Sequence, residues 1–356
     1  MRDKIIGIGI LAVIVAAALL YQFAFKGPQA VTLKGYVGGE KMAFLEDEEV
    51  RKILKKRYGI HLDYAKAGSI EMVKGEIKED VDYLWPSSQV ALELFKLTRP
   101  GNMVKSEIIF NSPIVLYSWE MVTEALTKLG IVKKIDESYY IVDFPKMVGL
   151  ILDNKKWSDI GLPELYGRVQ IISTDPSKSN SGNMYSGLLA NIIYGDVVSE
   201  QTLDRVLPKV KDVFLKLGYM EHSSSDLFEQ YLRTGIGAKP VIAGYENQII
   251  EFSLAYKNLW PRVKDKMRIL YPVPTVWSSH PLIIIKPRAK PLIQALQDKD
   301  VQRIAWEKHG FRTGLIGVQN DPKVLKVVGI PESITKVIPM PSPAVMDRII
   351  ESIQSH

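Results

Sequence analysis

Residues 173–187, with the sequence STDPSKSNSGNMYSG, bring hydroxyl and amide side chains together between two apolar segments. The preceding RVQIIS has the β-branched character of a buried strand. The segment that follows carries apolar residues at helical spacing, namely Met184, Leu188, Leu189, Ile192 and Ile193. The polar run is therefore expected to be the loop between a strand and a helix.

The helix that begins in this loop could hold a ligand at its N-terminus. Asn180 and Ser181 are good N-cap residues, and Gly182 would let the backbone approach a ligand closely. The first-turn N–H groups have no intrahelical partner, so such an end attracts an anion or a carbonyl oxygen. A capped helix with nothing bound is the simpler interpretation of this loop taken alone.

Four further polar loops rich in glycine or serine follow expected strands, at residues 38–41, 68–71, 86–89 and 244–247. Amphipathic helical patterns such as EDEEVRKILKKRYG alternate with these strands, which predicts βαβ units and mainly parallel sheets covered on both faces. In such sheets, ligands bind beyond the carboxyl ends of the strands. We therefore expect the polar loops to converge on one ligand site.

The composition excludes several classes of protein. With 46% hydrophobic and 24% charged residues, the chain is expected to be globular and long enough for two domains. The net charge of +6 gives weak support for an anionic ligand or an anionic membrane surface, and no basic run is long enough to predict a nucleic-acid partner. The absence of cysteine excludes disulfides, thiolate metal sites, a cysteine nucleophile and a lipid-modified cysteine anchor.

The N-terminus carries an apolar stretch without any charge from Ile5 to Phe25, long enough to cross a bilayer at about 20 residues per span. Arg2 and Lys4 precede it, so the positive-inside rule places everything after Lys26 outside the cytoplasm. A cleaved signal peptide is the alternative, but its apolar core would be shorter. Residues 1–27 are therefore predicted to be an uncleaved, single-pass membrane anchor with an extracytoplasmic domain behind it.

Two apolar segments, at 106–119 and 267–286, are expected to cross between two lobes. Prolines in the second segment fit edge or hinge strands better than central ones. The predicted division is 30–113 plus 275–356 for lobe 1, and 114–270 for lobe 2. This layout predicts a cleft between two Rossmann-like lobes that closes around a ligand.

The chain resembles the type 2 periplasmic or extracellular solute-binding proteins that serve ABC transporters. The resemblance covers nearly everything after the anchor and rests on VGGEKMAFL, AGSIEMV, FNSPIVLYS, DPSKSNSGN, YPVPTVWSSHPLII and the C-terminal KPLIQALQDKDVQRIAWEKHGFRTG. It implies two α/β lobes joined by two hinge strands, a small-molecule ligand in the cleft, an ABC permease as partner and a monomeric state. It implies neither catalysis nor a cofactor.

Within this family, DPSKSNSG looks most like the binders of oxyanions such as molybdate, tungstate, sulfate and phosphate. The ligand-binding residues that the resemblance and the loops imply are Gly39, Glu40, Lys41, Ser69, Ser87, Ser88, Ser179, Asn180, Ser181, Gly182, Tyr245 and Glu246. Neutral donors suit this task because a desolvated oxyanion needs every oxygen hydrogen-bonded.

Acidic residues in or beside the same loops depart from that pattern, namely Glu40, Glu71, Glu246 and Asp175. If two of them face the cleft, a protonated, polyhydroxylated or cationic ligand fits better, because a carboxylate repels an ionised anion. If they cap helices or face solvent, the oxyanion interpretation stands. A membrane-anchored receptor or accessory subunit that senses a sugar, an amine or a metal without transport is the alternative function.

Enzymatic chemistry has little support in the sequence. Ser278, Ser279 and His280 could suggest a nucleophile with its base, but no G-x-S-x-G elbow surrounds them. The histidines match no metal-binding spacing, and GIGAKP at 235–240 precedes an apolar strand instead of following one. We therefore predict a binding protein without catalytic residues or a bound metal.

Overall fold

In the computed structural model, which describes residues 29–355, the first strand already shows how the first lobe is assembled. Strand β1 (Val31–Val37) buries Leu33, Gly35 and Val37, whereas Lys34 is exposed and Tyr36 is partly buried, as expected for alternating side chains on a pleated strand. Helix α3 (Glu48–Tyr58) begins where the Asp47 side chain accepts two backbone N–H bonds. These local patterns produce the βα units that the sequence predicts.

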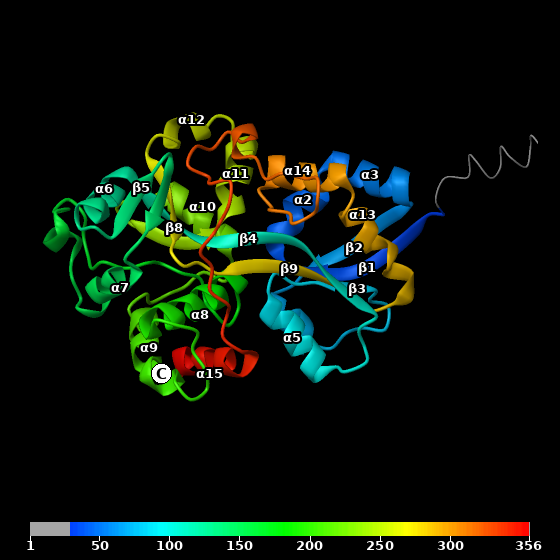
Figure 1. Ribbon diagram of the computed structural model, residues 1–356, viewed down its shortest axis with the longest axis horizontal. Helices are drawn as coiled ribbons and strands as arrows, with labels where there is room; N and C mark the ends of the chain where they lie inside the picture. The colour runs from blue at the N-terminus through cyan, green and yellow to red at the C-terminus, as the bar shows by residue number, and fades with distance from the viewer. Residues whose placement is uncertain (1–28, 356) are drawn as a thin grey trace, which may run out of the picture.

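The first lobe is a sheet covered by helices on both faces, and it is formed by two separate parts of the chain (Figure 1). Its elements before the crossing are β1, α2 (Met42–Glu46), α3, β2 (Ile60–Lys66), α4 (Ser69–Lys74), β3 (Tyr83–Trp85) and α5 (Gln89–Thr98), with a 3-10 helix at Gly39–Lys41. Its elements after the return are β9 (Trp277–Ile284), α13 (Pro291–Leu296) and α14 (Lys299–His309), with a 3-10 helix at Pro287–Ala289.

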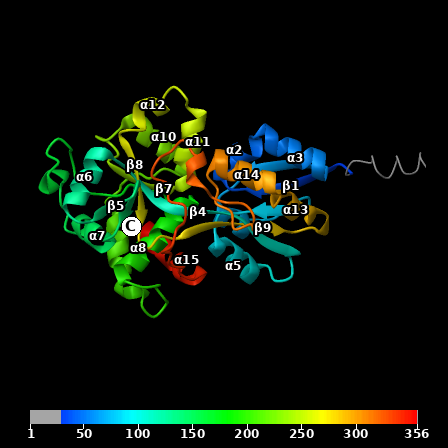
Figure 2. The ribbon, with the colours of Figure 1, turned by 45° about the horizontal axis from the view of Figure 1, so that its top comes forward.

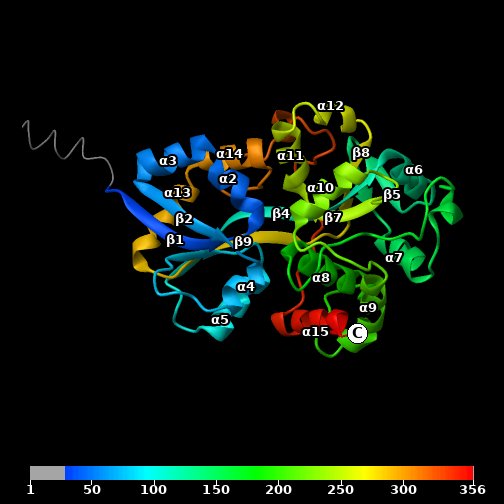
Figure 3. The same cartoon turned by 180° about the vertical axis from the view of Figure 1, so that it is seen from behind.

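The second lobe is likewise a sheet packed between two groups of helices. Its elements are α6 (Glu120–Lys128), β5 (Val132–Ile135), β6 (Ser138–Ile141), α7 (Phe144–Leu152), α8 (Asn180–Tyr194), α9 (Leu207–Leu215), α10 (Ser224–Thr234), β7 (Val241–Tyr245), α11 (Glu246–Ala255), α12 (Trp260–Val263) and β8 (Met267–Pro272), with 3-10 helices at Trp157–Ile160 and Leu203–Arg205. Figure 3 shows both lobes from behind, with α8 and α10 near the boundary between them.

One long strand, β4 (Lys105–Trp119), runs through both lobes. Its first part pairs with β9 of lobe 1, whereas its last part pairs with β7 and β8 of lobe 2. The strand order is β2-β1-β3-β9-β4-β8-β6-β5, with β7 also on β4. The expectation of mainly parallel sheets is wrong, because only β1–β2, β1–β3 and β6–β8 pair in parallel. A chain that crosses on one strand and returns on another makes those two strands antiparallel.

The C-terminal segment departs from the predicted division, which assigned all of 275–356 to lobe 1. Helix α15 (Pro343–Gln354) packs on α8 and α9 of lobe 2, where Val345, Met346 and Ile349 are buried. Figure 2 shows α15 beside α8. The chain between α14 and α15, which includes a 3-10 helix at Pro322–Val324, thus carries the C-terminus back across the molecule. The apolar face of α15 is covered by lobe 2, and its Asp347 forms an ion pair with Lys74 of α4.

Two further expectations concern the segment before α8 and the N-terminus. The expected strand at 168–173 is an extended segment that pairs with β7 at a single position, Ile172 to Ile242. Within residues 29–355, no helix combines the length and the apolar character needed to span a membrane. The anchor predicted at residues 1–27 lies outside the described residues.

Candidate ligand-binding site

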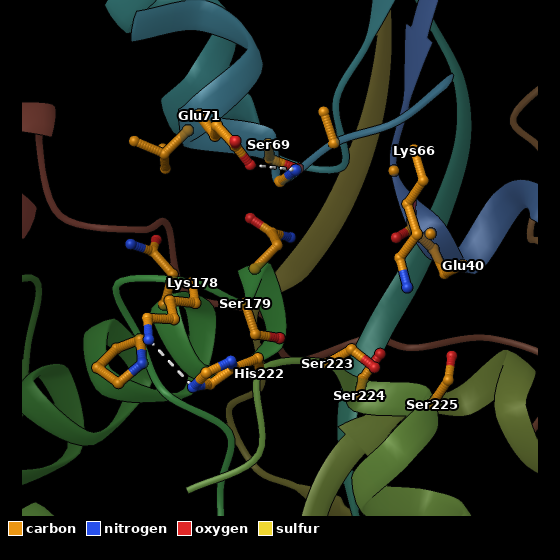
Figure 4. Close-up of a pocket in the computed structure, with 18 of the residues that line it drawn as sticks. Glu40, Lys66, Ser69, Glu71, Lys178, Ser179, His222, Ser223, Ser224 and Ser225 are labelled. Carbon is orange, nitrogen blue, oxygen red and sulfur yellow. Dashed lines mark hydrogen bonds between the residues drawn. The ribbon is translucent and has the colours of Figure 1, made fainter. Parts of the chain in front are cut away.

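A cavity of about 630 Å³ lies between the two lobes, at the ends of the strands and the beginnings of the helices. Lobe 1 contributes the loop after β1 and the loop from β2 into α4. Lobe 2 contributes the loop into α8, the loop into α10 and the end of β7. Figure 4 shows Lys66 and Glu40 on one side of this hollow, with Lys178 and His222 on another. The predicted polar loops of both lobes therefore reach one space, except the loop at 86–89, which contributes no lining residue.

The structure brings half of the sequence-predicted residues to this cavity. The residues that line it are Gly39, Glu40, Ser69, Ser179, Asn180 and Tyr245. The predicted residues that do not line it are Lys41, Ser87, Ser88, Ser181, Gly182 and Glu246. Each side chain of the second group has a partner within the protein, and the partner explains its direction. Ser88, for example, is the N-cap of α5 and accepts a hydrogen bond from the Val90 N–H at 3.1 Å.

Lys41 is fully buried and serves as the counter-ion of Glu40. Its Nζ also donates to Ser87 Oγ at 2.7 Å and lies 3.1 Å from His280 Nδ1. Burial raises the pKa of Glu40, but the charge of Lys41, the charge of His280 when it is protonated, and the hydrogen bonds from Lys41 and Ser87 outweigh burial and lower this pKa to about 2. Burial lowers the pKa of His280 well below its ordinary value, so its ring is neutral. The negative charge of Glu40 at the cavity wall is thus neutralised by Lys41, which is buried and does not line the cavity.

Ser181 and Gly182 form the contact between α8 and the preceding loop. Ser181 Oγ lies 2.8 Å from Thr174 Oγ1 and 3.0 Å from Ser179 Oγ. A Cβ at position 182 would lie 2.2 Å from the Thr174 carbonyl oxygen. Glycine at this position therefore permits close packing of α8 on its own loop. Gly182 does not line the cavity, so the expectation that it lets a ligand approach the backbone is wrong.

Glu246 points away from the cavity into a buried ion pair. Its carboxylate accepts from Arg312 Nε at 2.6 Å and from the Tyr271 hydroxyl at 2.7 Å, and the Glu246 residue has no exposed surface. Arg312 belongs to the segment that returns from α14 toward lobe 2. This acidic residue therefore holds two parts of the fold together, whereas Glu40 and Glu71 are the acidic residues that line the cavity from lobe 1.

The two lobes touch each other at the cavity. Asn180 Nδ2 donates to the Ser87 carbonyl oxygen of lobe 1 at 2.9 Å and to the Tyr245 hydroxyl at 2.9 Å. A Cβ at Gly68 would lie 3.3 Å from the carbonyl oxygen of Lys178, so the loops of α4 and α8 also meet. The described arrangement is therefore closed on this side of the cavity.

The sequence reasoning missed a second serine-rich loop and several basic residues. Besides Glu71, one of the acidic loop residues already considered, the additional polar lining residues are Lys66, Ser177, Lys178, Asn183, His222, Ser223, Ser224, Ser225 and Asp226. Lys178 Nζ lies 3.1 Å from His222 Nε2, and Ser223 Oγ accepts from the Asp226 N–H at the start of α10. The run EHSSSD at 221–226 is rich in serine, like the other loops. It follows no expected strand, so the rule that ligands bind in loops after strands did not select it.

The cavity combines cationic groups and helix-end donors with the carboxylates of Glu40, Glu71 and Asp226. Helices α8 and α10 both begin at it, and their N-terminal ends carry partial positive charge. Lys66 and Lys178 add two cationic side chains, and serine hydroxyls add neutral donors. In residues 29–355, no group of three or more His, Asp and Glu side chains is arranged to hold a metal ion.

No protein-family model and no curated protein sequence matches the chain. Solved structures do match it along most of its length. A Bordetella parapertussis protein assigned as an extracellular solute-binding protein superposes with a TM-score of 0.57 at 12% identity, over 90% of this chain and 96% of that one. The ferric binding protein from Campylobacter jejuni superposes with a TM-score of 0.55 at 14% identity, over 90% of this chain and 97% of that one.

The sulfate-binding protein SubI from Mycobacterium tuberculosis H37Rv gives a TM-score of 0.51 at 14% identity, over 90% of this chain and 96% of that one. At identities this low, the likeness concerns the fold. The solutes named for these proteins differ, so the shared feature is the pair of lobes. The described chain therefore has the two-lobed α/β fold of these solute-binding proteins.

Proposed function

We propose that the protein is an extracytoplasmic solute-binding protein that captures a small solute with an oxyanion group between its lobes and presents it to an ABC permease. The observation that carries this proposal is the cavity of about 630 Å³, whose lining comes from both lobes. A ligand that contacts both lobes stabilises the closed arrangement, and a permease can recognise that arrangement. The N-terminal apolar stretch would hold the protein at the membrane.

The cationic and helix-end donors support an anionic group in the solute. The side chain of Lys66 lies over Gly39, and Lys178 approaches from lobe 2 beside the α8 N-terminus. The Glu40 carboxylate is neutralised by Lys41, so it opposes an anion less than an unpaired carboxylate would. Sulfate, phosphate, molybdate and tungstate are the simplest solutes of this class, but the Glu71 and Asp226 carboxylates, which also line the cavity, oppose a fully ionised anion.

A binding role without catalysis is supported by the positions of the candidate nucleophiles. Ser278 Oγ donates to the Ser87 carbonyl oxygen at 2.6 Å, and Ser279 Oγ donates to Asn111 Oδ1 at 2.8 Å. Neither hydroxyl is paired with His280, whose Nδ1 faces Lys41. A nucleophile needs its base within hydrogen-bond reach, and the serines of this segment lack that geometry.

Thermal unfolding of the full-length chain with added anions tests the proposal. A solute at 100 times its Kd raises the unfolding free energy by about 2.7 kcal/mol. We expect stabilisation by at least one compound that carries a phosphate, sulfate, molybdate, tungstate or carboxylate group. Lys66→Gln and Lys178→Gln should each weaken binding about tenfold, because each removes a charged hydrogen-bond donor.

Lys133→Gln is the matched control, because Lys133 is exposed on β5 and does not line the cavity. It should leave the affinity within about twofold of the unchanged chain, as expected for a distant surface charge in salt. Equal effects of all three substitutions, or no response to any anion, would contradict the proposed site.

A further inference from the structure

Asn183 is a buried amide that the protein itself leaves without partners. Its residue is 1% exposed, and neither Nδ2 nor Oδ1 forms a hydrogen bond with any group in residues 29–355. It lines the interlobe cavity from the first turn of α8. A buried polar group without a partner costs about 1–3 kcal/mol, and at the cavity wall a ligand can supply the missing partner.

Asn180 is the first residue of α8, three positions before Asn183, and has a fixed orientation. Its Nδ2 donates to the Ser87 carbonyl oxygen, which can only accept, so the amide cannot be turned around. Its Oδ1 is then left buried and without a donor. Residues three apart share one face of a helix, so Asn180 and Asn183 both belong to the cavity side of α8. Two amide oxygens and one amide nitrogen there require partners.

Glu71 and Asp226 add two exposed carboxylates that would exchange water for donors of a solute filling the cavity. Glu71 accepts the Gly68 N–H at 3.3 Å through one oxygen only, and Asp226 lines the cavity at the start of α10. A fully ionised inorganic oxyanion has no proton to give to these oxygens. It would also fill only a small part of about 630 Å³, a volume in the range of about 300–1,000 Å³ that is typical of sites for organic ligands.

We infer that the solute is a small organic anion that carries hydroxyl or ammonium donors beside its anionic group, and that Asn183 is the residue that selects for those donors. This inference rests on the proposed function. The anionic group lies near Lys66, Lys178 and the helix ends, whereas the donors satisfy the oxygens of Asn180, Asn183 and the two carboxylates. Asn183 Nδ2 in turn donates to an oxygen of the same solute.

Calorimetric titration of the full-length chain with matched pairs of probes tests this inference. One pair is propyl phosphate with glycerol phosphate, and another is propionate with glycerate, which differ in their hydroxyl groups. The pair of ethyl phosphate and phosphoethanolamine differs by an ammonium donor. Inorganic phosphate and sulfate serve as anions without an organic part. We expect one donor-bearing probe to bind at least about tenfold more tightly than its partner and than the inorganic anions, because buried acceptors are left unpaired without it.

Asn183→Leu removes the amide at nearly constant size. It should reduce the preference for the donor-bearing probe to less than about threefold, because the donor-bearing probe loses its buried acceptor and the donor-free probe never used that acceptor. Without ligand, its melting temperature should be unchanged or higher, because a buried amide without partners is removed. Asn183→Asp, which keeps the acceptors and adds a charge, should weaken every anionic probe.

Asn191→Leu is the matched control on the same helix. Asn191 donates to the Pro339 carbonyl oxygen at 2.9 Å and accepts from the Val198 N–H at 2.9 Å. Its loss should lower the melting temperature and leave the preference between paired probes unchanged.

Inorganic anions that bind as tightly as every donor-bearing probe would overturn the inference and keep the proposed function. An unchanged preference in Asn183→Leu would overturn the role of Asn183. No binding of any anion, organic or inorganic, would refute the proposed function itself.

Discussion

Replacing Lys41 with methionine tests whether this lysine belongs to the fold and not to the ligand. In Lys41→Met, the Glu40 carboxylate keeps its buried position but loses its counter-ion, whose Nζ also lies 5.5 Å from the Trp85 ring centre. Removing one partner of a buried ion pair costs about 3–5 kcal/mol. The pKa of Glu40 gives a similar figure, since a pKa of about 2 in place of 4.5 corresponds to about 3 kcal/mol of folding free energy at neutral pH.

The contribution of Glu40 to the unfolding free energy changes with pH in opposite directions in the unchanged chain and in Lys41→Met. With Lys41 present, the folded-state pKa of Glu40 is below the unfolded value, so its stabilising contribution is full above pH 4.5 and is lost as the pH falls toward 2. In Lys41→Met, burial without a counter-ion raises the folded-state pKa of Glu40 above the unfolded value. Its contribution then favours folding in acid and is lost as the pH rises above 4.5.

Urea unfolding of the full-length chain between pH 3 and pH 7 measures this difference. We expect the two proteins to differ by about 1 kcal/mol in acid and by about 3–5 kcal/mol at neutral pH. Lys34→Met is the control, because Lys34 pairs with Asp80 on the surface, where an ion pair contributes less than about 1 kcal/mol. A loss in Lys41→Met that does not vary with pH, or that equals the loss in Lys34→Met, would refute the assignment of Lys41 as the counter-ion of Glu40.

Two further substitutions test the packing around the cavity. Gly182→Ala should destabilise the chain by about 1–3 kcal/mol, because the added methyl group meets the Thr174 carbonyl oxygen, and thermal unfolding would show the loss. Gly149→Ala, in open space on α7, should instead stabilise by about 0.5–1 kcal/mol through higher helix propensity. Arg312→Met should cost about 3–5 kcal/mol in urea unfolding, because Glu246 is left buried without its partner.

The exposed pair Arg303–Glu307 on α14 is the control for Arg312→Met. Arg303→Met should change the unfolding free energy by less than about 1 kcal/mol, as surface ion pairs do. A loss as large as that of Arg312→Met would indicate that the substitution of arginine, and not the burial of Glu246, causes the effect.

The alternation of strands and helices was predictable from the sequence, because it depends on local periodicity. Helix α8 with its buried Met184 and Leu188 follows from apolar residues at helical spacing. The convergence of loops on one cavity followed from the rule that ligands bind at the carboxyl ends of strands. Both inferences need only neighbours in the chain and a general property of sheets.

The direction of each side chain in those loops was decided by the tertiary structure. Lys41 is buried because its ammonium group meets His280, 239 residues away in the sequence, while Lys66 reaches the cavity in its place. Asn183 belongs to the polar run at 173–187 that predicts a loop and a helix start, but the fold leaves its amide without a partner at the cavity wall. Hydrogen bonds and ion pairs form between groups that the chain brings together over long separations, and residue spacing alone does not contain that information.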